Sequence, residues 1–428
     1  MALTGRLVAL AALGVLLAPI GTAALLGWLV VLALLTLVDL AWAAPITALQ
    51  FNREPTPALR LGVSGDSTLL VSNTGTRRWR GRIRDAWVPS AGASPREQPV
   101  AIGPGESRQL TTALTPTRRG ERSAAHLTIR SYGPLGLAGR QRRLVVAGSV
   151  RVLPAFASRK FLPEKLARLR QIDGAVLLRQ RGQGSEFDSL REYVAGDDIR
   201  AIDWRASARA PDVMVRTWRP ERDRHIVLAV DTGRTSAARI GDEPRLDAAL
   251  DACLLLGALA ARAGDRVAVV AADVVVRARL GLLSGGEVLP KLVLALAALE
   301  PALIESDPQL LAGEVGQLVT KRSLVVVFSA LDAASADSGL LPSVRRLAAR
   351  HQVMVASVRD PRLAQLAARR ADSAEVYTAA AAELALAERV LVAEQLNRLG
   401  AQVVDASAEV FASKVADAYL DLKAAGRL

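Results

Sequence analysis

The sequence is poor in the residue types that enzymes most often use for nucleophilic or metal chemistry. Of its 428 residues, one is cysteine (Cys253) and three are histidine. The single cysteine excludes an internal disulfide, and its place in an apolar run of alanine and leucine predicts a buried thiol rather than a reactive one. The three histidines are far apart in the chain, which disfavours a histidine metal site or a Ser-His-Asp triad.

Motifs for nucleotide binding and for zinc-dependent hydrolysis are also missing. There is no Walker A sequence and no HExxH motif. Gly182-Gln183-Gly184 begins like a dinucleotide fingerprint, but Phe187 stands where the third glycine belongs. The sequence therefore gives no sign of a nucleotide site of its own.

Basic residues outnumber acidic residues, and the excess is unevenly distributed. The net charge is +13, and residues 51–150 contain sixteen basic against six acidic residues. Residues 226–428 are close to neutral, with twenty-two basic and twenty-four acidic residues. A basic segment next to an apolar N-terminus favours attraction to anionic lipid and retention in the cytoplasm. Nucleic-acid binding is the less favoured interpretation, because it would rest on the basic composition alone.

A long apolar run opens the chain, with no charged residue from Leu7 to Val38. A single helix of that length would rise about 48 Å, well beyond a hydrocarbon core of ~30 Å. Pro19, Gly21 and Thr22 interrupt the run near its middle. We therefore predict a transmembrane helical hairpin within residues 1–45.

The two expected spans are about Leu3–Pro19 and Thr22–Ala43, with Asp39 snorkelling at the cytoplasmic edge. An even number of spans puts both termini on one side, and the basic segment assigns that side to the cytoplasm. This predicts a multi-pass protein of the inner (plasma) membrane with cytoplasmic soluble domains. The alternative is a signal peptide ending at Ala41-Trp42-Ala43, although the apolar run is long for one.

Short β-like runs separated by turn sequences follow in residues 55–154. They predict a small β-sandwich, with an immunoglobulin-like arrangement as one option. The expected strands are Thr68–Ser72, Arg80–Val88, Gln109–Leu114, His126–Arg130, Leu144–Ala147 and Val150–Leu153. Residues 155–224 are expected to connect this domain to the last one, beginning with a helix around Pro163–Ile172.

Apolar strands alternate with helices from residue 225 to 428, which predicts an α/β domain with a doubly wound, mainly parallel sheet. The expected strands are Ile226–Val230, Arg266–Ala271, Leu324–Phe328, Val353–Val358 and Gln402–Val404. The expected helices are Arg245–Ala263, Glu287–Leu299, Leu341–Arg350, Arg362–Ala368, Ala380–Leu399 and Ala408–Lys423. Ligands of such sheets bind at the carboxyl ends of the strands, where Asp231, Asp273, Asp332 and Asp360 occur.

The densest charge pattern lies between Gly184 and Arg222, with eight acidic residues, seven arginines and no lysine. An all-arginine set favours planar, bidentate pairing with carboxylates. We therefore expect a structural salt-bridge network at a domain junction, in which a buried Asp203–Arg209 pair would stabilise the soluble part. A docking surface and a catalytic site remain as alternatives, the last without a nucleophile–base pair beside it.

This stretch resembles the signature of a bacterial membrane-protein family catalogued as domain of unknown function 58 (DUF58). The residues that carry the resemblance are Gly184, Glu186, Phe187, Leu190, Arg191, Glu192, Tyr193, Gly196, Asp197, Asp198, Arg200, Ile202, Asp203, Trp204, Ser207, Ala208 and Arg209. Gly133-Pro134-Leu135-Gly136-Leu137 and the tail from Tyr419 to Leu428 are also similar to that family. The resemblance covers essentially the whole chain and implies that residues 225–428 form a von Willebrand factor type A-like domain.

Such domains bind a divalent cation through an Asp-x-Ser-x-Ser loop, a threonine on a second loop and an aspartate on a third. Here Asp231 matches, Gly233 has lost the first hydroxyl, Thr235 keeps one, and Asp332 would supply the last ligand. Arg234 would add a competing positive charge. The resemblance thus implies a degenerate Mg²⁺ site at Asp231, Thr235 and Asp332, and we expect binding there to be weak or absent.

The resemblance further implies a membrane-anchored, non-enzymatic binding or scaffold protein. It would be an adaptor for a MoxR-type AAA+ ATPase that assembles or activates an unidentified client. A chain without its own nucleotide motif fits that role. One alternative is a metal-dependent hydrolytic enzyme that uses Asp197, Asp198 and Asp203. Another is an electrostatic binder of anionic membrane or nucleic acid through residues 51–150.

Overall fold

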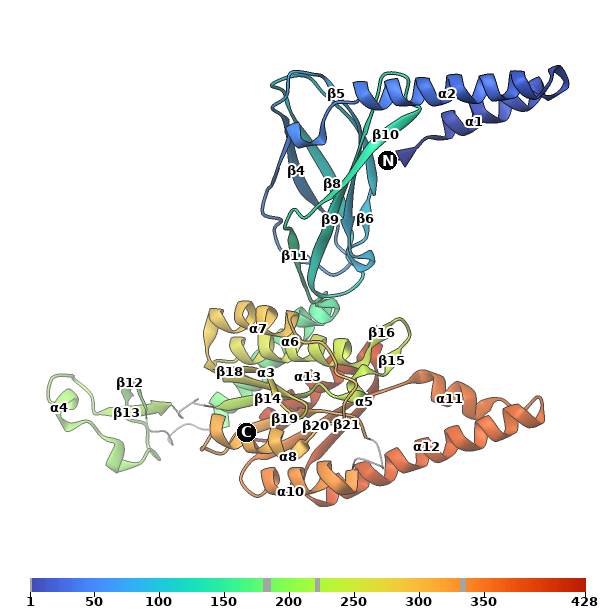
Figure 1. Ribbon diagram of the computed structural model, residues 1–428. Coiled ribbons are helices and arrows are strands. Elements are labelled where there is room, and N and C mark those ends of the chain that lie inside the picture. The colour runs from blue at the N-terminus through green and yellow to red at the C-terminus, as the bar shows by residue number, and fades with distance from the viewer. Residues whose placement is uncertain (1, 180–185, 220–223, 332–335) are drawn as a thin grey trace. The chain divides into compact units, whose positions relative to one another are not determined.

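The computed structural model describes residues 2–179, 186–219, 224–331 and 336–428. The chain divides into two compact units, Met1–Ala155 and Phe156–Leu428. Both helices and sheets are present, and an apolar helix lies near the N-terminus (Figure 1). The prediction of a mixed α/β protein is confirmed at this level.

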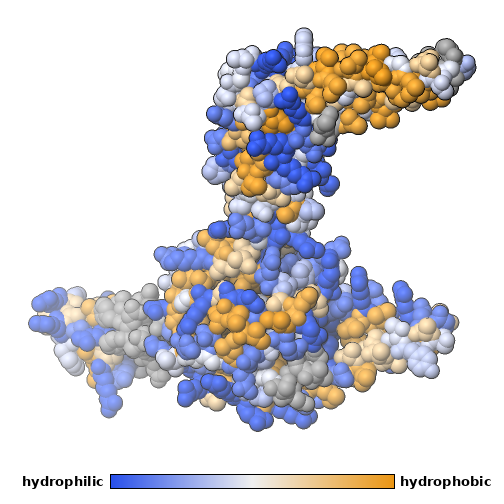
Figure 2. All heavy atoms as spheres, viewed as in Figure 1, coloured by the Kyte–Doolittle hydropathy of each residue, from blue (hydrophilic) through white to orange (hydrophobic). Residues whose placement is uncertain are grey.

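The N-terminal unit begins with two apolar helical arms, which Figure 2 shows as a continuous hydrophobic surface. The first arm comprises α1 (Gly5–Leu13) and the 3₁₀ turn η1 (Gly14–Ile20), and the second is α2 (Thr22–Trp42). The indole Nε1 of Trp28 donates to the carbonyl of Leu10 at 3.0 Å, so the two arms are in contact. Trp28 therefore joins the two arms.

One helix among the described residues, Thr22–Ala48, is long and apolar enough to cross a membrane. The other apolar helix, Gly5–Leu16, is shorter than a usual span. Aliphatic side chains are exposed along α2, with Leu26 at 61% and Leu37 at 60%. The structure thus confirms an N-terminal apolar helix, whereas the two predicted spans are not confirmed.

Asp39, near the end of α2, does not snorkel toward solvent as expected but is fully buried. Its carboxylate accepts four backbone N–H groups from a single loop, at 2.7–3.3 Å. The donors are Leu135, Gly136, Leu137 and Ala138. The start of the first arm holds the same loop, because Thr4 donates its backbone N–H to Leu137 and its hydroxyl to Gly136. Both arms are therefore anchored to one loop of the β-sandwich.

Two β-sheets complete this unit, with alternating side chains buried between them. The first sheet contains β2 (Leu49–Arg53), β4 (Gly65–Asn73), β8 (Ser107–Leu114) and β6 (Ala93–Ser94), in that order. The second contains β1 (Ala2–Leu3), β10 (Ala138–Leu144), β9 (Gly120–Tyr132), β11 (Ser149–Leu153), β3 (Leu59–Arg60), β5 (Trp79–Trp87) and β7 (Glu97–Ile102). Val71 from the first sheet and Trp79 from the second are both fully buried in one shared core.

The C-terminal unit is built on a six-stranded sheet whose strand order follows the doubly wound pattern. Along the sheet the strands are β18 (Val276–Leu283), β17 (Arg266–Ala272), β14 (His225–Asp231), β19 (Leu324–Phe328), β20 (Gln352–Arg359) and β21 (Gln402–Ser407). The strands are parallel except for β18, which pairs with β17 in the antiparallel sense. The strand order reverses between β14 and β19, and ligands of open α/β sheets bind outside the carboxyl ends at such a point.

Helices cover the sheet in two groups. The first comprises α6 (Arg245–Arg262), α7 (Val288–Ala297), α13 (Ala408–Ala424) and α3 (Leu162–Arg179). The second comprises α8 (Pro308–Leu318), α10 (Leu341–Ala348) and α12 (Ser373–Arg398), which follows α11 (Pro361–Ala368). Val227 and Val325 pack with the second group, while Phe328 meets Phe411 of α13 edge to face at 6.3 Å.

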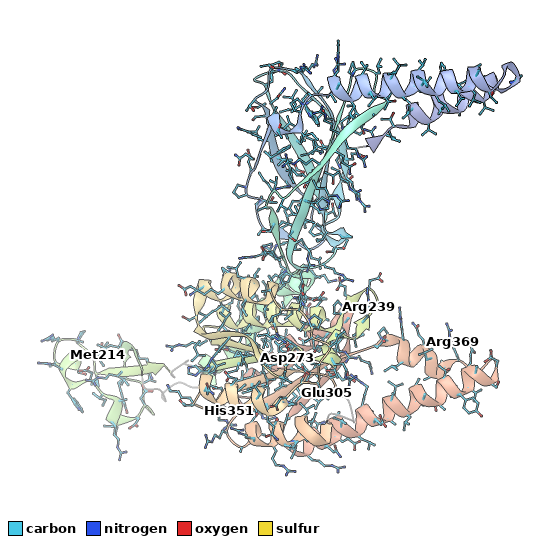
Figure 3. All side chains as sticks on the ribbon, viewed as in Figure 1. Met214, Arg239, Asp273, Glu305, His351 and Arg369 are labelled. Atoms are coloured by element: carbon cyan, nitrogen blue, oxygen red, sulfur yellow. The ribbon has the colours of Figure 1, made fainter. Side chains whose placement is uncertain are left out.

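A separate two-stranded sheet holds much of the charged signature. β12 (Glu186–Glu192) pairs with β13 (Met214–Arg219), and between them lie the turn η5 (Ile199–Ala201) and the short helix α4 (Trp204–Ser207). We call residues 186–219 the signature hairpin. Met214, labelled in Figure 3, is on its second strand.

Candidate functional site

Asp231 ends β14 at the point where the strand order reverses. Its side chain is 7% exposed and is surrounded by donors from three loops. Oδ1 accepts the backbone N–H of Gly233 at 2.9 Å and the hydroxyl of Ser306. Oδ2 accepts the hydroxyls of Ser329 at 3.0 Å and Thr235 at 3.4 Å. The sheet topology therefore gathers one carboxylate and three hydroxyls at a single place.

This cluster lines a pocket of about 290 Å³ whose mouth carries an exposed ion pair. Arg234 Nε and Glu305 Oε2 are 2.9 Å apart, and both side chains are more than half exposed. Figure 3 labels Glu305 on the loop before α8. Arg234 was expected to compete with a metal ion through its positive charge. Glu305 pairs with its guanidinium and so offsets part of that charge.

Gly233 has a steric reason to be glycine. A Cβ built at this position would lie 2.0 Å from Ser306 Oγ and 2.9 Å from the carbonyl oxygen of Ile304. The loop that carries Ser306 thus fills the space of the side chain that Gly233 lacks. The hydroxyl of Ser306 donates to Asp231 from there, a contact that the loop motif alone does not predict.

The other carboxylates at the strand ends have structural partners. Asp273 is fully buried, accepts the Thr232 hydroxyl at 3.1 Å and pairs with Arg277 at 2.7 Å. Burial would raise the pKa of Asp273, but the hydrogen bonds from Arg277, the Val275 amide and Thr232 outweigh it and lower the pKa. Asp360 caps α11 by accepting the backbone N–H of Arg362. Asp332, predicted as a third ligand, lies outside the described residues.

The oxygen atoms around Asp231 are of the type that a hard cation prefers, but most of them are uncharged. Oxygen ligands suit Mg²⁺, and Asp231, Thr235, Ser306 and Ser329 all present oxygen. Within the described parts of the chain, however, no three histidine, cysteine, aspartate or glutamate residues are placed to hold a metal ion together. Two further carboxylates line the pocket, but Glu305 pairs with Arg234 and Asp307 caps α8. A cation bound here would therefore rely mainly on Asp231 together with neutral hydroxyls.

The signature hairpin uses its acidic residues within itself. Arg191 and Asp197 form an ion pair, and the Val194 amide also donates to Asp197. Asp203 caps α4 and pairs with Arg216 at 2.8 Å. Both ion pairs are partly exposed, so the expected buried pair between Asp203 and Arg209 is wrong.

These contacts change the acidity of the two aspartates. The guanidinium of Arg191, together with the Val194 amide, lowers the pKa of Asp197. The guanidinium of Arg216, with the Ala206 and Arg205 amides, lowers the pKa of Asp203. Both carboxylates are therefore held in their charged form. Asp198 caps η5 by accepting the Arg200 amide.

Apolar and basic side chains are left exposed on the hairpin. Trp204 is 68% exposed, Ile199 67% and Val194 62%. Arg200, Arg205 and Arg209 are also exposed, and no ion pair joins them to another described residue. The signature residues Leu190, Glu192, Tyr193, Gly196, Ile202, Ser207 and Ala208 are also described, whereas the side chains of Glu186 and Phe187 lie outside the description. Ser207 ties α4 to β13, because its hydroxyl accepts the Met214 amide at 2.8 Å.

Residues 189–391 match the model of a family described as "Protein of unknown function DUF58". Over these residues the chain is similar to the DUF58 family. The DUF58 region begins in β12, contains the Asp231 pocket and ends within α12. The resemblance noted from the signature residues is thereby confirmed, and the family carries no assigned reaction.

Uncharacterized proteins of Mycobacterium tuberculosis and Mycobacterium bovis are 26% identical to this chain over 187 residues. The match covers 43% of this chain and spans 58% of the length of these relatives. Among solved structures, a conserved hypothetical protein BatB from Bacteroides thetaiotaomicron is similar over 47% of this chain and 99% of its own, with 14% identity and a TM-score of 0.32. A FixG-related protein from Vibrio parahaemolyticus is similar over 24% of this chain and 94% of its own, with 13% identity and a TM-score of 0.18.

Proposed function

We propose that this DUF58 protein is a membrane-anchored, non-enzymatic adaptor whose signature hairpin docks onto a partner protein. The observation that carries the proposal is the exposure of Trp204 beside Arg200, Arg205 and Arg209. Tryptophan and arginine are the side chains most enriched at binding hot spots. The internal ion pairs of Asp197 and Asp203 leave these three arginines available, so the partner surface is acidic with an apolar pocket for the indole.

The partner in this proposal is a MoxR-type AAA+ ATPase, and the pair acts on a client protein. The absence of a nucleotide motif in the sequence supports a division of labour in which the ATPase supplies the energy. The α/β unit is in this proposal von Willebrand factor type A-like. The strand order and the position of Asp231 at the reversal point support that relationship.

The anchor in this proposal is the pair of N-terminal arms, which make the protein multi-pass in the inner membrane with its soluble units in the cytoplasm. Asp39 supports an anchor over a cleaved signal sequence, because cleavage after Ala43 would remove the acceptor of four backbone amides, two of them buried. Exposed Arg140, Arg142 and Arg143 follow on β10, directly after the loop that Asp39 holds. They are placed to meet anionic lipid.

The signature hairpin gives little support to the alternative function, that of a hydrolytic enzyme. A general base works best with a pKa near the operating pH, which for a carboxylate requires an increase. The pKa values of Asp197 and Asp203 are instead lowered. Their oxygens are also engaged by Arg191, Arg216 and backbone amides.

The test is binding of the full chain, reconstituted in lipid nanodiscs, to a purified MoxR-type ATPase from the same organism. Trp204→Ala and Arg205→Glu should each weaken binding by tenfold or more, about 1.4 kcal/mol. Tyr377→Ala and Arg369→Glu are matched controls, since both side chains are exposed on the α11–α12 segment outside the hairpin. Equal losses in all four variants, or no binding by the unchanged protein, would refute the proposed partnership.

A further inference from the structure

The outer edge of β21 is open to a further strand. β21 pairs with β20 on one side, and within the described residues no strand pairs with its other side (Figure 1). A groove of about 420 Å³ runs along this edge, and all six residues of β21, Gln402–Ser407, line it. An edge strand with free backbone N–H and C=O groups is a template for strand addition by an extended peptide.

The wall of the groove is one face of α13. Val410, Lys414, Asp417 and Asp421 line it at a spacing of four, three and four residues, which places them on one side of the helix. Val410 is 43% exposed and offers an apolar contact. Arg359, opposite Ser407 in the strand register, closes the end of the groove at the carboxyl side of the sheet.

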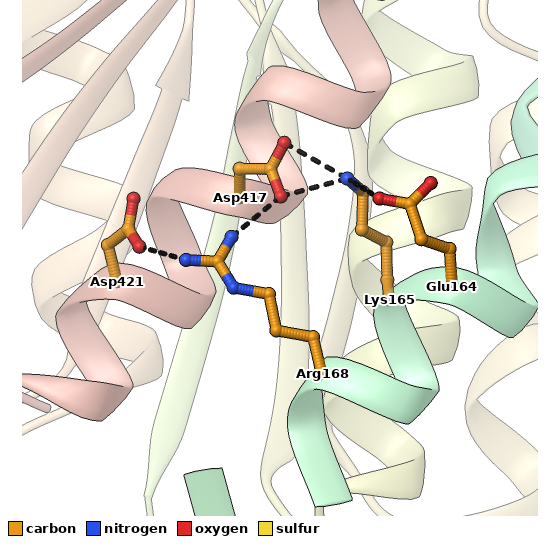
Figure 4. A network of polar contacts seen from close by, with 5 residues as sticks. All are labelled: Glu164, Lys165, Arg168, Asp417 and Asp421. Atoms are coloured by element: carbon orange, nitrogen blue, oxygen red, sulfur yellow. Dashed lines mark hydrogen bonds and ion pairs between the residues drawn. The ribbon is translucent and has the colours of Figure 1, made fainter. Parts of the chain in front are cut away.

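The three acidic residues of the groove already have basic partners. Asp405 pairs with Arg389 at 2.7 Å. Asp417 accepts from Lys165 at 2.8 Å and from Arg168 at 2.9 Å, and Asp421 pairs with Arg168, as Figure 4 shows. Basic side chains of α12 and α3 therefore neutralise these carboxylates.

The two basic residues of the groove have no such partners. Arg359 and Lys414 are both exposed, and neither forms an ion pair with any residue that the structure describes. The charge left for a ligand is thus positive, and it lies beside backbone groups that are ready to form hydrogen bonds.

We propose that this groove binds an acidic, extended segment of a partner protein, which adds to β21 as a seventh strand. The backbone of β21 provides the hydrogen bonds, while Arg359 and Lys414 select acidic side chains and Val410 contacts an apolar one. This site lies on α13 and β21 and stands independently of docking by the signature hairpin.

The test uses a labelled, end-capped peptide of alternating glutamate and valine, about eight residues long to match a strand edge. Titrated against the full chain in nanodiscs, it should bind saturably and slow hydrogen exchange at the amides of residues 402–407. Arg359→Glu with Lys414→Glu should weaken binding by about tenfold or more. Arg345→Glu with Arg369→Glu, which reverses two exposed charges outside the groove, should leave binding unchanged.

A second peptide with the same side chains, N-methylated at every residue, separates strand addition from attraction between charges. It keeps the negative charge but loses the N–H donors, and it should not bind. The proposal is overturned by equal binding of the two peptides, by equal losses in the two double variants, by protection of other amides, or by the absence of saturable binding at millimolar peptide.

Discussion

At the scale of single residues, Asp39 shows how a charge within an apolar helix can serve the fold. Its two carboxylate oxygens accept hydrogen bonds from four backbone amides of the loop that follows β9, and the side chain is fully buried. Leaving a buried donor without its acceptor costs about 1–3 kcal/mol. Several donors here depend on one carboxylate, so Asp39 couples the helical arms to the β-sandwich.

We predict that Asp39→Ala lowers the unfolding free energy of the N-terminal unit by about 3 kcal/mol. Asp39→Asn, which keeps one acceptor oxygen, should have an intermediate effect. Hydrogen exchange of the full chain in detergent should show faster exchange at residues 135–138 in the same order. Unchanged exchange in Asp39→Ala would mean that the loop is held mainly by Thr4 and β1.

Asp251 gives a prediction about pH. Burial raises the pKa of Asp251, although the amide of Ser158 donates to both of its oxygens, at 3.2 and 3.1 Å. A carboxyl whose pKa is raised on folding contributes stability that is fully present below its unfolded pKa, about 3.9, and is lost as the pH rises through the folded value. The melting temperature of Asp251→Asn, minus that of the unchanged protein, should therefore increase from acidic to neutral pH.

The control for Asp251 is Asp212→Asn, which removes the same charge from an exposed site on the signature hairpin. Its difference in melting temperature should change little with pH. A difference for Asp251→Asn that shrinks with rising pH would show that the fold favours the charged carboxylate.

At the scale of elements, long apolar patterns were predictable and irregular ones were not. The strands β14, β17, β19 and β20 and the helix α6 lie where the sequence places them, because fully buried strands and helices carry continuous apolar runs. β18 was missed, since its side chains alternate between arginine and apolar residues on an antiparallel edge. α8 was missed too, because two glycines interrupt its pattern.

The candidate site was predictable only as far as its position at the strand ends. Asp231 and Thr235 were found from their loop, but Ser306 and Ser329 reach the carboxylate through sheet topology that spacing does not reveal. The partners of Asp203 were also not predictable. A hairpin pairing brings Arg216 to Asp203, whereas Arg209 is closer in sequence.

The loops around Asp231 give the next prediction. Gly233→Ser should not restore a metal site but should destabilise the C-terminal unit by about 1–3 kcal/mol, the usual cost of overpacking. The reason is the predicted contact of the new Cβ with Ser306 Oγ. Adding Ser306→Ala should recover part of the stability in thermal melts of the full chain. A Gly233→Ser protein with full stability would mean that this loop moves freely.

Mg²⁺ titration of the full chain by calorimetry tests the same cluster. We expect binding in the millimolar range or weaker, because a hard cation needs several charged or well-placed oxygens. Of the three described carboxylates that line the pocket, Glu305 pairs with Arg234 and Asp307 caps α8, which leaves Asp231 as the main charged ligand. Saturable micromolar binding that disappears in Asp231→Ala would instead establish a working cation site, with further ligands from outside the described residues.

At the scale of the whole molecule, the anchoring loop bears on how the chain meets the membrane. Thr4, before the first arm, and Asp39, near the end of the second, both hold residues 135–138. Both ends of the helical pair therefore lie beside the same part of the β-sandwich. In the proposed anchor, a pair of helices that starts and finishes at one loop leaves and re-enters on one side of the bilayer.

We predict from this that reporters fused to the N-terminus and to the C-terminus are both active on the cytoplasmic side. The excess of arginine in residues 51–150 assigns that side. The second arm, with 21 residues in α2, spans about 30 Å at 1.5 Å per residue. The first arm is shorter, so it crosses only with local thinning of the bilayer or enters and returns. A periplasmic C-terminus would contradict the anchor, revive the signal-sequence alternative and place the signature hairpin beyond the reach of any cytoplasmic ATPase.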